Sequence, residues 1–561
     1  MFKLRHRSAR LAVTASVLAT GLGALALASG TPAAHADPAS YKSANNTPYI
    51  GFGSDTIQDL FNAFSGQEPS AGLQPSNIST KLASVFYTPL HTDSTDAKHP
   101  NEVVVSFDAL DPHIPAPTSN TQTVTPVAGG ATFDRPNGSG DGRAALDASL
   151  HAGATFARSS QPGTPEPTAG LISFARSSGK SGTAGSTPTG DMSLIPFASD
   201  GIGYAFHCAN PGTADCTALQ SLTIANFHAL YANTGTAGNG NGTLSSGNGG
   251  WTGTNTLEIC AINTGSGTFK TFLNDVGFTA STATTDAQTS VTATGGSQCS
   301  AVEENNLSSF LSTATGLSST SDWVIPTSMG NDVAQHNGVA LNRSAATGFV
   351  FFNTNGAFTS GNGIAGVADA WNASSTTSVT AGTAGTTISI NLKPAVGATL
   401  TLAPTFGGSP NETVTVTSVT GTDPYTVGIT GAGVGGGTVN SYTAPFSVSQ
   451  TISLSGNFPS SGAWSANDTY YGSFFGRWLF VVVPSASITS GLTLDQGMAD
   501  LFYTPLATTS TGNPSHIAAI CQTSSQTTIT SFGFDPALPD NGTASEQNGT
   551  CGTVAFSNAS S

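Results

Sequence analysis

The spacing of apolar residues changes along this chain, and this change is the feature that most limits the possible folds. Up to about residue 325, short apolar runs such as Glu102–Phe107 alternate with helical stretches such as Thr223–Tyr231 and with Gly/Pro loops. Residues 373–457 instead alternate apolar with hydroxyl residues, as in Thr386–Leu392, between Gly and Pro turns. The first pattern is typical of an α/β arrangement, and the second of an all-β module, most simply a small immunoglobulin-like sandwich. Because the α/β pattern resumes at Tyr470–Pro484, the β module is predicted to be an insert.

The N-terminal residues have the pattern of an export signal. A basic start precedes the apolar stretch Leu11–Leu27, and Ala34-His35-Ala36 supplies small residues for cleavage, which we expect after Ala36. The basic residues are Lys3, Arg5, Arg7 and Arg10. No cysteine precedes Cys208, so we expect a secreted protein without a lipid-anchor cysteine. No later stretch is long and apolar enough to cross a bilayer, which predicts no membrane insertion.

Charge is scarce and acidic, at 9% of residues. Without the four basic residues of the signal, 12 Lys and Arg remain against 32 Asp and Glu, a net charge near −20 before histidines are counted. Nucleic-acid binding needs clustered cations, and adsorption to an anionic membrane surface needs a basic patch, so both are disfavoured. An anionic ligand would have to be held by backbone N–H groups and hydroxyls.

The chain has six cysteines, an even number, after an export signal, and this pattern predicts disulfides. By proximity in the sequence we pair Cys208 with Cys216, Cys260 with Cys299 and Cys521 with Cys551, among fifteen possible connectivities. No C-x-x-C spacing occurs, which disfavours a redox or zinc site.

The segment Tyr49–Gly66 begins like a strand, turns at Gly53-Ser54-Asp55-Thr56, and continues as an amphipathic helix. We call this turn between a strand and a helix, residues 53–56, a corner. Two interpretations of its residues are possible. Ser, Asp and Thr cap helices by accepting hydrogen bonds from the first backbone N–H groups. The same N–H groups and the helix dipole also attract anionic ligands.

Three further corners share this Gly/Ser chemistry near strands and helices. Arg135–Arg143 runs into a helix, Phe174–Gly179 follows a strand, and Asn263–Leu273 leads from a strand into a helix. Runs of Gly and Ser let consecutive N–H groups form a concave nest for an anion. Helix capping is enough to explain any single corner. Four such corners favour one shared ligand site, because ligands of open α/β sheets lie beyond the carboxyl ends of strands.

These corners resemble, in the same order, the ligand loops of the phosphate-specific substrate-binding proteins of ABC transporters, and most of all the secreted versions from high-GC Gram-positive bacteria. The motifs are Gly51–Gln58, Arg135–Gly140, Phe174–Ser178 and Gly265–Thr268. The resemblance covers roughly residues 49–370 and 465–505 and excludes the β module. It implies an α/β fold of the periplasmic-binding-protein-like type II class, in which two hinged lobes close over a tetrahedral oxyanion.

Together, the resemblance and the patterns predict a domain organisation. We expect a signal peptide at 1–36, the first part of α/β lobe I at 37–200, α/β lobe II at 201–325, the return to lobe I at 326–372, the β-sandwich module at 373–457, and the remainder of the α/β core with a disulfide-linked C-terminal region at 458–561.

Carried over by residue, the resemblance implies a set of ligand-binding residues. Two family features differ: Ser178 stands where the family commonly has an aspartate, and no arginine shortly precedes Gly265. Arg176, Arg143 or Arg135 is then the candidate cation, and Asp55 the candidate acceptor for a phosphate proton. The ligand-binding set that the resemblance implies is Ser54, Asp55, Thr56, Ser139, Gly140, Arg176, Ser178, Ser266, Gly267 and Thr268.

Three function classes follow from these observations. The first is a secreted solute-binding protein that captures phosphate or a similar oxyanion by hinge closure, without catalysis, cofactor or metal, as a monomer that delivers to an ABC permease. The second is a non-transport cell-surface or matrix protein that reuses the fold, with the β module mediating adhesion to a cell-wall component. The third is a secreted hydrolase of phosphate esters, for which no G-x-S-x-G elbow is present. We predict the first.

Overall fold

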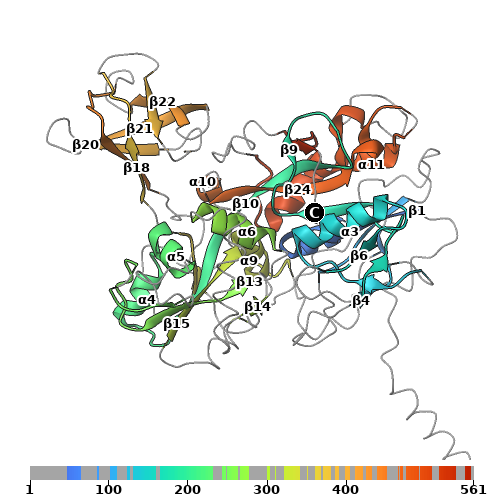
Figure 1. Cartoon of the computed structure of the whole chain (residues 1–561), viewed down its shortest axis with the longest axis horizontal. Coiled ribbons are helices and arrows are strands. Elements are labelled where there is room, and N and C mark those ends of the chain that lie inside the picture. The colour runs from blue at the N-terminus through green and yellow to red at the C-terminus, as the bar shows by residue number, and fades with distance from the viewer. Residues whose placement is uncertain are drawn as a thin grey trace, which may run out of the picture.

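A computed structural model of the chain supplies the coordinates and combines helices with mixed sheets (Figure 1). It describes residues 47–64, 85–86, 102–109, 123–126, 130–158, 164–231, 243–247, 249–262, 266–276, 300–302, 307, 310, 321–340, 350–351, 361–367, 370–380, 386–390, 394, 399–404, 411–420, 425–431, 439–451, 465, 468–471, 475–491, 493–507, 517–538 and 550–557. The predicted α/β class is confirmed by this mixture. The predicted signal peptide lies outside the described residues.

The centre of the molecule is one large mixed sheet. Its strand order is β11-β12-β15-β10-β24-β8-β1-β3-β2, with short strands β16, β17, β25 and β9 attached. β1 pairs in parallel with β3 and β8, and β12 with β15, whereas β10 is antiparallel to both β15 and β24. The bounds are β1 (Thr47–Gly53), β2 (Val85–Phe86), β3 (Glu102–Ser106), β8 (Phe174–Ser177), β9 (Thr183–Ala184), β10 (Met192–His207), β11 (Thr243–Leu244), β12 (Thr256–Ile259), β15 (Ser321–Ser328), β16 (Val350–Phe351), β17 (Asn362–Ala365), β24 (Gly476–Pro484) and β25 (Phe556–Ser557).

Strand β10 passes through both halves of this sheet. Its residues 192–201 pair with β24, and its residues 202–207 pair with β15. The predicted boundary between lobe I and lobe II, between Asp200 and Gly201, falls within this continuous strand. Gly201 is needed inside it because a Cβ atom there would lie 2.6 Å from the ring of Tyr471.

Strand β24 shows how a short apolar run becomes a central strand. Leu479 and Val481 belong to a buried cluster on one side of the sheet, and Trp478 and Phe480 to a cluster on the other. Successive side chains of a strand point to opposite faces, so a strand buried on both faces needs a continuous apolar run. The α/β pattern predicted to resume at Tyr470–Pro484 therefore includes this buried strand.

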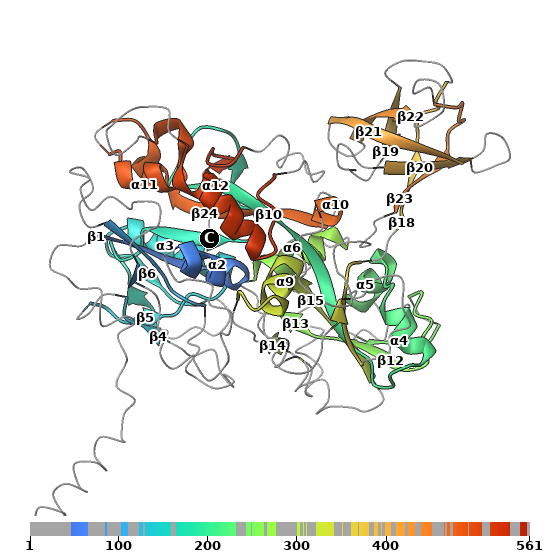
Figure 2. The same ribbon diagram turned by 180° about the vertical axis from the view of Figure 1, so that it is seen from behind.

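The helices pack on both parts of the sheet, and several begin near its middle (Figure 2). A short 3₁₀ turn, η1, leads directly into α2. The helices are η1 (Asp55–Ile57), α2 (Gln58–Phe64), α3 (Ser139–Leu150), α4 (Ala214–Leu219), α5 (Ile224–Tyr231), α6 (Gly267–Asp275), α9 (Met329–His336), α10 (Asp468–Tyr471), η3 (Ser485–Ile488), α11 (Gln496–Phe502), η4 (Thr504–Leu506), η5 (Ala519–Cys521) and α12 (Thr523–Ser531). Three small two-stranded sheets complete the α/β part: β4 (Thr123–Val124) with β5 (Phe133–Asp134), β6 (Thr155–Phe156) with β7 (Glu166–Pro167), and β13 (Ala261–Ile262) with β14 (Ser300–Val302).

The inserted segment forms its own all-β unit, which we call the β module (Ala370–Thr451). Its described strands form one antiparallel sheet in the order β18-β23-β20-β21-β22-β19, rather than the two sheets of an immunoglobulin-like sandwich. The N–H of Thr376 donates to the carbonyl of Ser389 at 3.0 Å, joining the two edges of the sheet around a separate apolar core. The module lies beside the α/β part in both views, and Ile224 of α5 packs against its core (Figures 1 and 2). Its strands are β18 (Ala370–Ser375), β19 (Thr387–Ile390), β20 (Thr399–Pro404), β21 (Glu412–Thr420), β22 (Tyr425–Gly431) and β23 (Phe446–Thr451).

Two of the three predicted disulfides are confirmed. Cys208 is bonded to Cys216, and Cys521 to Cys551. The predicted partner of Cys260, Cys299, lies outside the described residues. Within the described part of the chain, no helix has both the length and the apolarity needed to cross a membrane.

Candidate functional site

The first predicted corner lies where β1 ends. Gly53 has a φ of 122°, a conformation that favours glycine, and Ser54 follows it as the N-cap residue of η1. The Ser54 side chain makes no capping bond to its own helix among the described residues. Its hydroxyl instead donates to Ser178 Oγ at 2.9 Å. Capping therefore does not explain this serine.

The second corner meets the third at the same place. Gly138, with a φ of 95°, precedes α3, so the helix begins at Ser139, earlier than the sequence predicted. Ser139 Oγ lies 3.1 Å from Ser178 Oγ and accepts a hydrogen bond from the Ser178 N–H at 2.9 Å. Gly140 lies in the first turn of α3, where backbone N–H groups lack partners within the helix. Ser178 follows β8 directly.

The fourth corner approaches these residues from the other half of the sheet. Ser266 does cap its own helix, because its hydroxyl accepts from the Phe269 N–H at 3.1 Å. Gly267 comes so close to the other corners that a Cβ atom there would lie 2.6 Å from Ser139 Oγ and 2.7 Å from Ser178 Oγ. Thr268 Oγ1 lies 3.2 Å from Thr56 Oγ1.

The four predicted corners thus converge. We call Ser54, Thr56, Ser139, Ser178 and Thr268 the hydroxyl cluster, and each is at most 1% exposed. The cluster lies at the starts of three helical segments, η1–α2, α3 and α6. Helix starts carry partial positive charge and N–H groups without intrahelical partners. The arrangement therefore offers hydroxyl and backbone donors for a buried, negatively charged group.

Arg176 lies beneath the cluster and is fully buried. Its guanidinium donates to the carbonyls of Ser54 and Phe107 at 3.2 and 2.7 Å and to Ser106 Oγ at 2.6 Å. Burial lowers its pKa to about 10, although nearby carboxylates, Asp55 among them, act in the opposite direction, so it stays protonated at neutral pH. Because its guanidinium donates to backbone carbonyls and to Ser106, Arg176 holds the first corner in position.

Two more arginines reinforce the third corner. Arg143 Nη1 donates to Ser177 Oγ at 2.9 Å, and burial lowers the pKa of Arg143 to about 10. Arg477 Nη1 donates to the Ser178 carbonyl at 3.1 Å, while its Nη2 forms a buried ion pair with Asp200 at 2.7 Å. The third candidate cation, Arg135, donates to the Asp108 carbonyl at 3.0 Å.

The start of α9 also contributes to the site, although the sequence did not predict it there. Ser328 caps this helix and donates to Asp200 Oδ2 at 2.9 Å. Asn331 Nδ2 donates to the Thr56 carbonyl at 3.1 Å, which ties α9 to the first corner. The segment Ser328-Met-Gly-Asn331 follows a strand just as the predicted corners do, so the same strand-then-Ser/Gly signal would have found it.

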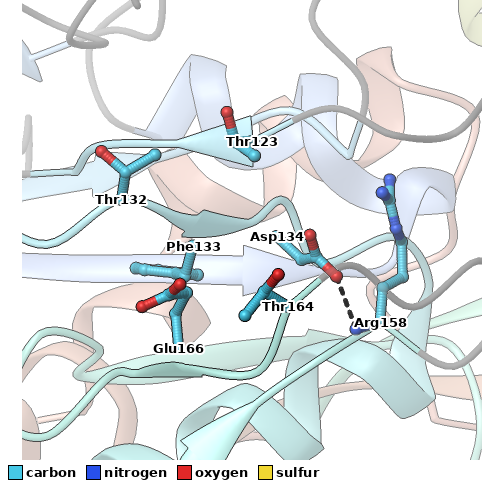
Figure 3. Close-up of a pocket in the computed structure, with 7 residues that line it drawn as sticks. All are labelled: Thr123, Thr132, Phe133, Asp134, Arg158, Thr164 and Glu166. Carbon is cyan, nitrogen blue, oxygen red and sulfur yellow. Dashed lines mark hydrogen bonds between the residues drawn. The ribbon is translucent and has the colours of Figure 1, made fainter.

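A cavity of about 380 Å³ lies elsewhere, near β4 and β5, and contains none of the predicted site residues (Figure 3). Arg158 lines it and is 1% exposed, and its guanidinium nitrogens have no hydrogen-bond partner among the described residues. Its backbone N–H donates to Asp134 Oδ2 at 3.1 Å. Burial lowers the pKa of Arg158, and Asp134 partly opposes this. Since Asp134 and Glu166 also line the cavity, it is a poorer anion site than the hydroxyl cluster.

Comparison of the chain with protein-family models, with curated proteins and with solved structures found no match.

Proposed function

We propose that the protein captures phosphate, or a similar tetrahedral oxyanion, at the hydroxyl cluster and breaks no bond in it. The observation that carries the proposal is that Ser54, Ser139 and Ser178 contact one another from three separate corners while Gly267 approaches from a fourth. Hydroxyls and helix-start N–H groups would replace the water shell of the anion. Buried Arg143 and Arg176 would supply the compensating positive charge, since that of Arg477 is already paired with Asp200.

Opening of two lobes would let a ligand reach the buried cluster, and their closure would then enclose it. The contacts between Thr56 and Thr268, and between Asn331 and the Thr56 carbonyl, join the two halves of the sheet. Opening the cluster would break these contacts and the packing of α9 against Gly533 and Phe534, with β10 as one of the connections that remain. In this proposal the two halves act as the lobes of a binding protein, and the hydroxyls, which bond to one another in the form described here, would separate to admit the anion.

Asp55 would select among oxyanions. Its side chain is 1% exposed and belongs to the first corner. A carboxylate accepts the proton of hydrogenphosphate but repels fully ionised sulfate, which has no proton to donate. We therefore expect phosphate to bind more tightly than sulfate, and Asp55→Asn to reduce this preference.

Calorimetric titration of the purified protein with phosphate and sulfate tests the proposal. Ser139→Ala removes a hydroxyl of the cluster, and a lost hydrogen bond to a charged group costs about 1.5–3 kcal/mol, or about 10- to 150-fold in affinity. Ser193→Ala is the matched control, because Ser193 is also fully buried and its hydroxyl lies 2.8 Å from that of Ser485, in a separate serine pair.

Phosphate binding that is weakened by Ser139→Ala and kept by Ser193→Ala supports the proposal. Absence of binding to every oxyanion tested, or equal affinity in the two variants, refutes it.

A further inference from the structure

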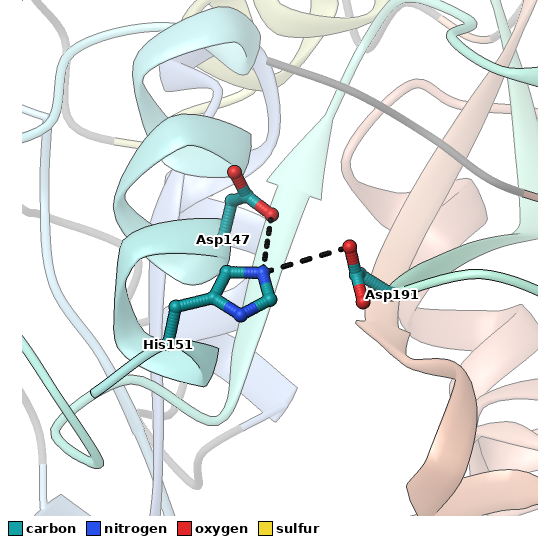
Figure 4. Close-up of side chains that lie close together, drawn as sticks. All are labelled: Asp147, His151 and Asp191. Atoms are coloured by element: carbon teal, nitrogen blue, oxygen red, sulfur yellow. Dashed lines mark ion pairs between the residues drawn. The ribbon is translucent and has the colours of Figure 1, made fainter. Parts of the chain in front are cut away.

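Two carboxylates and one imidazole lie together at the end of α3 farthest from the hydroxyl cluster (Figure 4). His151 Nε2 lies 3.6 Å from Asp147 Oδ1 and 3.5 Å from Asp191 Oδ2. One ligand atom from each residue falls within 4.8 Å of the other two. Asp147 and His151 stand one helical turn apart, and Asp191 comes from the chain just before β10.

The spacing of these atoms matches the edges of a tetrahedron around zinc. With Zn–N and Zn–O bonds of about 2.0–2.2 Å, two tetrahedral ligand atoms lie about 3.4 Å apart. An octahedral magnesium site, with bonds of about 2.0–2.1 Å, would place neighbouring ligand atoms about 2.9 Å apart and prefers oxygen to imidazole. The observed separations of 3.5 and 3.6 Å are closer to the first geometry.

We propose that Asp147, His151 and Asp191 bind a divalent zinc ion, with water in the fourth position. The helix favours this position, because the C-terminal end of α3 carries partial negative charge that stabilises a cation. The ion would link the end of α3 to the chain entering β10. The site is independent of anion binding at the hydroxyl cluster.

The exposure of the three side chains makes the site accessible and testable. Their exposed fractions are 38% for Asp147, 51% for His151 and 58% for Asp191, so substitutions there leave the buried core intact. The same separations would also suit a protonated His151 held between two carboxylates without metal. Metal titration separates these two possibilities.

The test is calorimetric titration of the purified protein with Zn²⁺ alone, followed by thermal unfolding with and without the ion. We expect about one ion per chain at this site and an unfolding temperature that rises with Zn²⁺ concentration. His151→Ala and Asp191→Asn should each weaken this binding at least about tenfold, since even outer residues around a metal typically matter that much. His228→Ala, which removes an exposed histidine on α5, is the matched control and should bind Zn²⁺ as the unaltered protein does.

Two outcomes would overturn the proposal. One is Zn²⁺ affinity that is the same in His151→Ala as in the unaltered protein. The other is that the unaltered protein neither binds Zn²⁺ nor gains stability from it. A lower stability of Asp191→Asn would not rescue the proposal in that case, because the loss of a metal-free ion pair with His151 explains it.

Discussion

Substitution of Gly267 by alanine tests the convergence of the four corners with a single methyl group. The added Cβ would lie 2.6 Å from Ser139 Oγ, 2.7 Å from Ser178 Oγ and 3.0 Å from the Gly179 nitrogen. All three separations are shorter than ordinary van der Waals contact. The serines cannot simply turn away, because Ser139 Oγ also accepts the Ser178 N–H. Closure of the two halves around the ligand must therefore become less favourable.

The size of the effect follows from the cost of overpacking. An extra methyl group in a well-packed site typically costs about 1–3 kcal/mol. Because each 1.4 kcal/mol is tenfold in affinity, the Kd for phosphate should rise about 5- to 150-fold. Alanine is favoured over glycine in a helix by up to about 1 kcal/mol, which offsets part of any loss in folding stability. The expected signature is a large loss of affinity with a small change in unfolding temperature.

The assay is calorimetric titration with phosphate together with thermal unfolding of the same samples. Gly185→Ala is the matched control, since a Cβ atom at Gly185 meets nothing within 4 Å. If Gly267→Ala binds phosphate as tightly as Gly185→Ala does, the anion does not sit where these corners meet. The proposed site is then wrong, whatever the protein binds elsewhere.

Three further outcomes are expected. Arg477→Met leaves Asp200 buried without its ion-pair partner, so the free energy of unfolding in urea should fall by about 3–5 kcal/mol; a smaller loss than about 1 kcal/mol would contradict this. Replacing both Cys521 and Cys551 by serine opens a loop with a sequence separation of 30 and should cost about 3.6 kcal/mol by the same measurement, a figure that an unchanged urea midpoint would refute. Replacing the β module by a short Gly/Ser linker should leave phosphate affinity unchanged, because its first and last residues are paired and its core meets the α/β part at Ile224, which is not a residue of the hydroxyl cluster; calorimetry that shows lost binding in a folded variant would show that the module contributes to the site.

Local patterns in the sequence predicted the pieces of the fold well. The run Trp478–Val483 could only be buried on both faces, and the structure places it at the centre of the sheet. The lobe boundary predicted after Asp200 falls inside the continuous strand β10, where Gly201 leaves room for the rings of Tyr470 and Tyr471.

The candidate site could be predicted only where a short stretch of sequence identifies its residues. A Gly/Ser turn next to a strand and a helix start can be recognised in Ser54, Ser139 and Ser266 without any coordinates. Which hydroxyl contacts which partner depends on pairs far apart in the sequence, such as Arg477 and Ser178. No spacing rule relates such pairs, so the contacts of Arg477 and of the start of α9 emerged only from the structure.

The two interpretations of the first corner make different claims about where a serine hydroxyl points. A capping serine bonds to its own helix, as Ser266 does with the Phe269 N–H. Ser54 stands at the same position of its helix, yet its hydroxyl turns away to Ser178, a residue from another strand. A buried hydroxyl without a hydrogen-bond partner in its own helix needs one elsewhere. The partner of the Ser54 hydroxyl is Ser178, which lies beside the starts of α3 and α6. Capping accounts for Ser266, whereas the proposed anion site would account for the direction taken by Ser54.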